Sequence, residues 1–162
     1  MRYILIFILT IGLAIAGPFE DHPYFKAITG NWVGEGELVS KDGTTIQTRE
    51  IWEGKLNEHG SYSISGDRVM GDNNQEFTWN FTHNPATDLY ECHYTHTGMD
   101  NPIRLTVTVS DEKIVLSAPF GDSAELTIRK VLVDKTIEGN VLIKDASGID
   151  ALKGKVIHKR SQ

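Results

Sequence analysis

The sequence predicts an all-β protein, an antiparallel up-and-down β-barrel of about ten strands with one short N-terminal helix. Two observations support this fold class. Polar and apolar residues alternate along most of the chain, and turn-forming residues such as glycine, proline, asparagine and aspartate interrupt the alternation at short intervals. Alternation gives each strand one apolar and one polar face, which is typical of an antiparallel sheet with one face in water. Because a sheet of this size would have exposed edges, we expect it to close.

The elements follow from local signals in chain order. Asp21 as N-cap, Pro23 in the first turn and Gly30 at the end predict one short helix. Beyond it the alternation predicts strands at 31–40, 44–54, 60–69, 75–82, 88–96, 102–110, 112–118, 123–132, 136–144 and 153–160. Residues 145–152 are expected to form a loop or a single turn. The interior of a closed barrel of about ten strands is larger than the volume that its own side chains fill, so a cavity is expected.

Residues 28–38, ITGNWVGEGEL, contain three glycines, which could belong to a nucleotide-binding loop or to a strand. A dinucleotide loop needs Gly-x-Gly-x-x-Gly between a strand and a helix, and a phosphate loop needs a following Lys-Ser or Lys-Thr pair. Neither pattern is present here. Glycines also occur where a strand bends sharply or another backbone approaches closely. Gly34 and Gly36 are expected on the same strand face as Trp32.

The stretch Gly30-Asn31-Trp32-Val33-Gly34-Glu35-Gly36, after a short helix in an all-β chain, resembles the calycins, which include lipocalins and fatty-acid-binding proteins. The Gly-x-Trp-x-Gly-x-Gly first strand is most similar to nitrobindin-type haem barrels and to uncharacterised bacterial lipocalin-like domains. The resemblance implies that a basic side chain, Lys159 or Arg160, packs over Trp32 as a cation–π pair. It also makes haem a candidate cofactor. Nitrobindins hold haem through a histidine near the start of the last strand, whereas His158 lies close to the end of that strand here.

The N-terminus has the pattern of an export signal. Arg2 precedes an uncharged, mostly apolar run that ends in Ala14-Ile15-Ala16. We therefore expect a secretory signal peptide at 1–16, one barrel domain at 17–162, and a secreted or periplasmic protein without a membrane span after cleavage. The run is shorter than the roughly 20 residues that span a bilayer.

The composition limits the classes of molecule that the protein is expected to bind. The formal net charge of −6 argues against nucleic acid and anionic membranes as the main partners. Cys92 is the only cysteine, so an intramolecular disulfide is excluded. Asn80 begins a glycosylation motif, which matters only in a eukaryotic secretory pathway.

Five residues are candidates for binding a ligand in the barrel interior or at its end: Trp32, Trp52, Trp79, Arg104 and Arg129. The alternative for the tryptophans is a structural role in the core, and for the arginines a solvated surface position. An inward-pointing Arg104 or Arg129 would suit a ligand carboxylate.

The spacing of the other reactive residues indicates structural roles rather than metal binding or catalysis. Cys92, Tyr94 and His96 are expected on one strand face and His93 on the other, so the histidines cannot share a metal ion. Cys92 and His96 are roughly 13 Å apart along a strand, which is too far for a nucleophile and its base. The glutamates of the first two strands are expected on the solvent side: Glu35, Glu37, Glu50 and Glu53.

The sequence therefore predicts an exported β-barrel that binds a small apolar or amphipathic molecule. We expect no catalytic residues, no metal site and no cofactor. Two alternatives are a haem protein that uses His158 and a structural or interaction platform without a ligand, whose protein partner is unknown.

Overall fold

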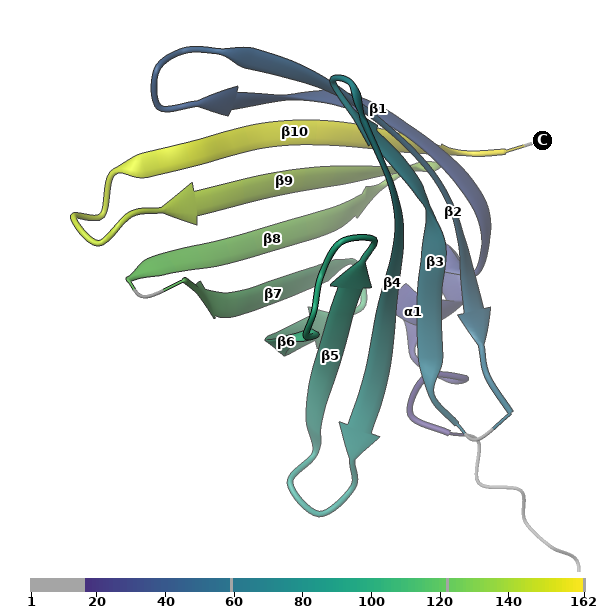
Figure 1. Ribbon diagram of the computed structural model, residues 1–162. Coiled ribbons are helices and arrows are strands. Elements are labelled where there is room, and N and C mark those ends of the chain that lie inside the picture. Colours follow the sequence, from purple (N-terminus) through teal and green to yellow (C-terminus); the bar gives the residue numbers. More distant parts are fainter. Residues whose placement is uncertain (1–16, 59, 122, 162) are drawn as a thin grey trace, which may run out of the picture.

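The computed structural model describes residues 17–58, 60–121 and 123–161 and shows one short helix and a closed barrel (Figure 1). The helix α1 spans Pro23–Ile28. The strands are β1 (Gly30–Ser40), β2 (Thr45–Leu56), β3 (Tyr62–Met70), β4 (Asn73–Asn84), β5 (Leu89–His96), β6 (Ile103–Ser110), β7 (Lys113–Phe120), β8 (Ala124–Val133), β9 (Thr136–Lys144) and β10 (Asp150–Arg160).

The fold class predicted from the alternation is confirmed. Each strand pairs antiparallel with its neighbours in sequence, and β1 also pairs with β10 to close the barrel. In this closing seam Trp32 lies opposite Arg160, and Ser40 lies opposite Leu152. The predicted loop at 145–152 is shorter than expected, because β10 begins at Asp150 with an irregularity in its pairing to β9 before Leu152.

The helix α1 lies where the sequence predicts it, but with different caps. His22, not Asp21, is the N-cap, and its Nδ1 accepts a hydrogen bond from the backbone N–H of Tyr24 at 3.2 Å. Pro23 explains the shift, because a residue before proline favours the extended conformation that an N-cap needs. Gly30 already belongs to β1, with φ +107°, so Thr29 is the C-cap. Among the described residues, no helix has the length and apolar character required to cross a bilayer.

The helix closes one end of the barrel with aromatic side chains. Phe25 packs edge-on against Phe19, with ring centroids 4.8 Å apart, and also contacts Tyr62 and Phe81. The indole N–H of Trp32 donates to the carbonyl of Ile28, 2.9 Å away, at the end of the helix. Buried aromatic side chains therefore pack together beside the helix at this end of the barrel.

The glycines of β1 are sites of close approach, as the sequence predicts. A Cβ on Gly36 would lie 2.0 Å from the carbonyl oxygen of Lys155 in β10, and one on Gly34 would lie 2.3 Å from the ring of His158. Only glycine lets the first and last strands approach this closely. The closing seam and the position of His158 both depend on these residues.

Arg160 joins the last strand to the helix. Its guanidinium lies 4.8 Å from the ring of Trp32, which confirms the cation–π pair that the resemblance implies. Nη1 donates to the carbonyl of Thr29 at 2.9 Å, and Nη2 donates to the carbonyl of Ala27 at 2.7 Å. These carbonyls belong to the helix end, where backbone acceptors lack partners within the helix.

We expect Arg160→Ala to lower the free energy of unfolding by about 1–3 kcal/mol, because it removes the cation–π pair and both hydrogen bonds to α1. Urea unfolding followed by tryptophan fluorescence measures the change. The exposed neighbour Lys159 provides the control, and Lys159→Ala should change stability by less than about 0.5 kcal/mol. Equal effects of the two substitutions would refute this role of Arg160.

Candidate functional site

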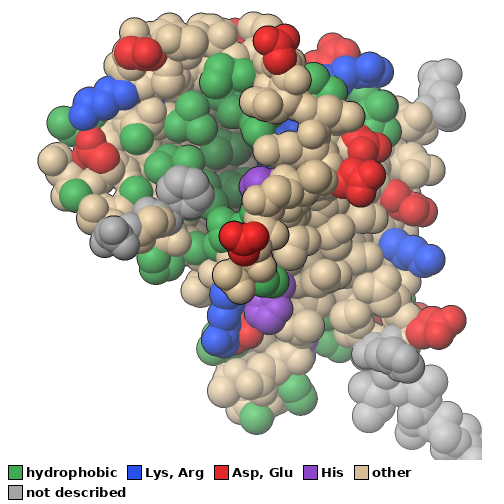
Figure 2. Space-filling model, viewed as in Figure 1, with side chains coloured by type: hydrophobic (Ala, Val, Ile, Leu, Met, Phe, Trp, Pro, Cys, Tyr) green, Lys and Arg blue, Asp and Glu red, His purple; other side chains and the backbone are tan. Residues whose placement is uncertain are grey.

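A cavity of about 220 Å³ occupies the half of the barrel opposite α1. Its wall is mainly aliphatic, with side chains from β1, β8, β9 and β10: Leu38, Leu126, Ile128, Val141, Ile143 and Leu152. Figure 2 looks toward this end and shows a hollow lined by hydrophobic side chains. An apolar wall around a concave space is typical of small-molecule sites.

The floor of the cavity is a cluster of charged side chains. Glu50 in β2 accepts from Arg68 Nε at 2.6 Å through Oε1, and from His158 Nε2 at 2.8 Å through Oε2. Arg68 also donates from Nη1 to the hydroxyl of Tyr94, 3.1 Å away. The side chains of Glu50 and His158 are only 7% and 1% exposed. Four strands, β2, β3, β5 and β10, thus contribute to one network.

The network determines the charge of Glu50. Burial alone would raise the pKa of this carboxyl, but the hydrogen bond from His158 and the nearby charges of Arg68 and Lys130 outweigh it and hold the pKa far below the ordinary value. For Arg68, burial opposes the charge and Glu50 favours it, with a net increase of its pKa. Glu50 and Arg68 therefore form an ionised pair inside the barrel. Breaking such a pair by removing one partner typically costs 3–5 kcal/mol.

His158 fits into the floor because glycines surround it. A Cβ on Gly34 would lie 2.3 Å from the imidazole, and one on Gly139 would lie 3.5 Å from it. Nδ1 lies 3.4 Å from the carbonyl oxygen of Ile137. Burial lowers the pKa of His158 despite the hydrogen bond to Glu50, which raises it. The lowered pKa favours a neutral imidazole, which can donate from Nε2 to Glu50.

Lys130 is the remaining charged group of the floor. It lies on β8, is 7% exposed, and lines the cavity. Its Nζ lies 5.1 Å from the ring centroid of Trp52 and 5.4 Å from that of Trp79, so it contacts both indoles. Thr48 Oγ1 and the indole nitrogens of Trp52 and Trp79 find no hydrogen-bond partner among the described residues.

The five predicted ligand residues divide into two groups. Trp32, Trp52 and Trp79 are all buried inside the barrel, and Trp79 lines the cavity, while Trp32 belongs to the closed end. A ligand contact for them stays a prediction. The interior placement of Arg104 and Arg129 is wrong, because both side chains lie exposed on the outer face. Arg104 forms an ion pair there with Glu91 of the neighbouring strand.

The expectation that Glu50 faces solvent is also wrong, whereas Glu35 and Glu37 do lie on the outer face. Strand alternation could have predicted that Glu50 faces inward, because Glu50 is two residues from Trp52 and side chains two apart lie on the same strand face. The same spacing places Lys130 on the face of Ile128. Isolated charged residues on apolar strand faces were thus the sign of the buried cluster.

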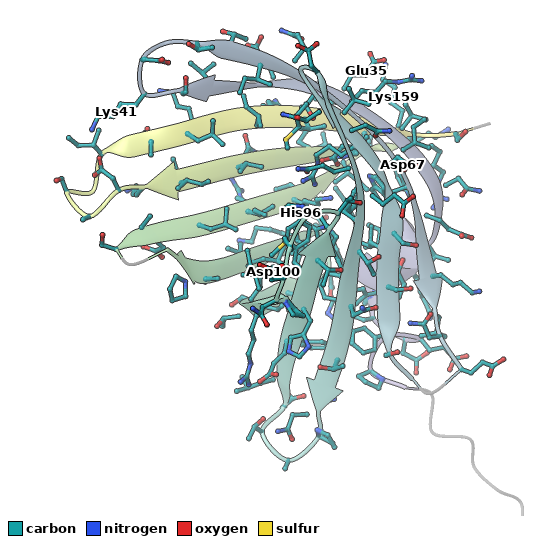
Figure 3. All side chains as sticks on the ribbon, viewed as in Figure 1. Glu35, Lys41, Asp67, His96, Asp100 and Lys159 are labelled. Atoms are coloured by element: carbon teal, nitrogen blue, oxygen red, sulfur yellow. The ribbon has the colours of Figure 1, made fainter. Side chains whose placement is uncertain are left out.

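Figure 3 shows how the labelled polar residues lie around the barrel. Glu35, Asp67 and Lys159 come from three different strands and lie on the outer surface. His96 at the end of β5 lines the cavity, and Asp100 lies in the loop that follows. As predicted, Cys92 and Tyr94 share the inner face with His96, while His93 is exposed.

No protein-family model and no curated protein matches the chain. Solved structures do share its architecture. The S-type phycobiliprotein lyase CPES from Guillardia theta is 10% identical, with a TM-score of 0.59 over 85% of this chain and 90% of that one. Rv2717c from M. tuberculosis is 11% identical, with a TM-score of 0.61 over 84% of this chain and 94% of that one.

A protein of unknown function from the DUF3598 family of Nostoc punctiforme is 10% identical, with a TM-score of 0.57. The match covers 85% of this chain and 49% of that chain, so this chain spans about half its length. At these identities the likeness is one of fold alone, and membership of the calycins stays a prediction. A specific subfamily stays a prediction.

We expect the unfolding free energy to fall as pH drops from 7 to 5, partly through His158. Its folded pKa is below the ordinary 6.5, so the unfolded chain binds the proton more readily and acid favours unfolding. One such group contributes at most about 1.4 kcal/mol per pH unit. His158→Gln keeps a donor for Glu50 and should make the slope shallower, as measured by urea unfolding at each pH.

The exposed His93 provides the control, and His93→Gln should keep the slope of the unsubstituted protein. Identical slopes for His158→Gln and the unsubstituted protein would contradict this assignment.

Proposed function

We propose that this protein is an exported container that binds a small, mostly apolar or amphipathic molecule inside its barrel. The observation that carries the proposal is the cavity of about 220 Å³, with aliphatic walls and a polar floor. An apolar cavity of about 150 Å³ is enough to bind benzene. The space therefore suits a ligand somewhat larger than that, such as a medium-length hydrocarbon chain.

The polar floor favours a ligand with an oxygen-bearing end. Lys130 and Arg68 supply nitrogen donors at the cavity, and the Tyr94 hydroxyl lies beside Arg68. Buried polar groups without partners cost about 1–3 kcal/mol each, so an acceptor near Thr48 or Trp79 would recover part of that cost. The ligand's apolar part would lie against the aliphatic walls, with its oxygen toward the floor.

Export rests on the sequence. The predicted signal peptide at 1–16 lies outside the described residues, so its expected cleavage and the secreted or periplasmic location belong to this proposal. The barrel core begins with Phe19, downstream of the predicted cleavage site. Cleavage after Ala16 would leave that residue and everything after it in the mature chain.

Native mass spectrometry of the protein from its own host's exported fraction tests both parts of the proposal. We expect a chain that lacks residues 1–16 and carries an additional mass of a few hundred daltons, in the range of small-molecule ligands. Denaturation should release that mass. An uncleaved chain would contradict export.

Binding to the cavity is tested with nonanol as an apolar probe with one hydroxyl. Val141 lines the cavity, and Val141→Phe should weaken nonanol binding about tenfold or more, because the added ring occupies the ligand's space. Leu142 is the neighbouring residue with its side chain on the other strand face, and Leu142→Phe is the matched control. Isothermal titration calorimetry measures each affinity. Equal affinities for both variants, or no binding to the unsubstituted protein, would refute the cavity as the site.

Haem binding is the second candidate, and the geometry argues against His158 as its ligand. Nε2 is engaged by Glu50, Nδ1 faces the carbonyl of Ile137, and the ring is 1% exposed. Iron could bind only after the Glu50 hydrogen bond is lost. A haemin titration that gives no Soret shift would exclude this candidate. The third candidate, a platform without a ligand, would gain support if neither nonanol nor haemin binds.

A further inference from the structure

Lys130 differs from the other lysines in its surroundings. Its neighbours on β8, Arg129 and Val131, lie toward the outer face, while Lys130 itself is 7% exposed and lines the cavity. Two indole rings flank its Nζ, at 5.1 Å and 5.4 Å. A primary amine is thus held at the floor of an apolar cavity.

The amine has no counter-ion of its own. Both carboxylate oxygens of Glu50 are already engaged, one by Arg68 and the other by His158. Among the described residues, no carboxylate oxygen lies within 4.0 Å of Lys130 Nζ. Since Glu50 and Arg68 balance each other, an ammonium at Lys130 would be an unbalanced buried charge, which is costly.

The groups around Lys130 come from four other strands. Burial has the largest effect and lowers the pKa of Lys130; the charge of Glu50 opposes this, and that of Arg68 adds to it. Burial also raises the pKa of the Cys92 thiol and lowers that of His158, so both are neutral near pH 7. The free amine of Lys130 is therefore more populated at neutral pH than that of an ordinary lysine.

We propose that Lys130 captures apolar aldehydes covalently, by forming an imine with the carbonyl carbon of a ligand whose hydrocarbon chain occupies the cavity. The inference rests on the proposed function, because it uses the same cavity. It goes beyond that function by naming the ligand's reactive group and the atom that binds it.

The reaction needs no further reactant. The lone pair of Nζ attacks the carbonyl carbon and forms an N–C bond, and one N–H proton passes to the carbonyl oxygen to give a carbinolamine. The second N–H proton then leaves with the hydroxyl group as water, and a C=N bond forms. One amine and one aldehyde thus give one imine and one water, with no change in oxidation state.

The surroundings of Lys130 favour the product as well as the nucleophile. The aliphatic walls limit the water that would hydrolyse the imine. When the imine takes up a proton it becomes a cation, and the faces of Trp52 and Trp79 stabilise it as they would an ammonium.

The test uses nonanal with sodium cyanoborohydride, which reduces an imine to a stable secondary amine. Intact mass and peptide mapping locate the adduct. At pH 7 we expect about tenfold or more adduct at Lys130 than at any exposed lysine, because the cavity holds the aldehyde beside Nζ and the lowered pKa of Lys130 leaves more free amine. Lys130→Met should abolish this adduct, whereas Lys153→Met, which alters an exposed lysine of β10, should leave it unchanged.

Two further measurements separate the outcomes. Lys130→Met nearly conserves side-chain volume, so it should still melt cooperatively, which shows that the barrel is intact. Lys153→Met, which lies outside the cavity, should also bind nonanol as the unsubstituted protein does. Nonanal adducts spread evenly over exposed lysines, in a protein that binds nonanol, would overturn the inference and leave the proposed function standing. Nonanoate binding that depends on Lys130, without a nonanal adduct, would show an anion anchor instead and also overturn it. Failure to bind nonanol would refute the proposed function itself.

Discussion

The pairing of β1 with β10 is the constraint on which the rest of the structure depends. It turns a ten-strand meander into a closed barrel and so creates an interior. The seam forms only because Gly34 and Gly36 let the last strand approach, and because Arg160 fastens that strand to the helix end. It also brings His158 beside Glu50, which is 108 residues away in sequence. The cavity wall, the attachment of α1 and the charged floor thus all depend on the pairing of β1 with β10.

The interior divides into two parts with different physical roles. Toward α1, aromatic rings pack together and supply apolar burial that stabilises the barrel. On the other side the same inward faces carry aliphatic residues that leave a space. The ion pair of Glu50 with Arg68 lies at the boundary. Buried ion pairs contribute little net stability compared with an apolar core, so stability alone does not account for this one.

Much of the fold could be predicted from the sequence, because strand alternation and turn residues are local signals. The ten strands and the helix follow from these signals, and the glycines that follow Trp32 correctly indicate the close approach of another strand. The site was harder to predict. Glu50, Arg68 and Lys130 become neighbours only through strand register, which no local pattern reveals, and a charged residue on a strand is usually solvated. Arg104 and Arg129 lie within strands, but each occupies a position whose side chain faces outward. A shift of one residue along the strand would have turned it inward.

The register of the seam has a consequence for the order of folding. Trp32 and Arg160 are partners although nearly the whole barrel separates them in sequence. Contacts between such distant residues are slow to form, because the intervening chain must first be ordered. During synthesis β1 emerges early, yet its second neighbour emerges last. Until β10 pairs with it, β1 has an unpaired edge, and the helix end lacks its hydrogen bonds from Arg160. The barrel therefore cannot close until β10 has been made, and the enclosed cavity depends on that closure.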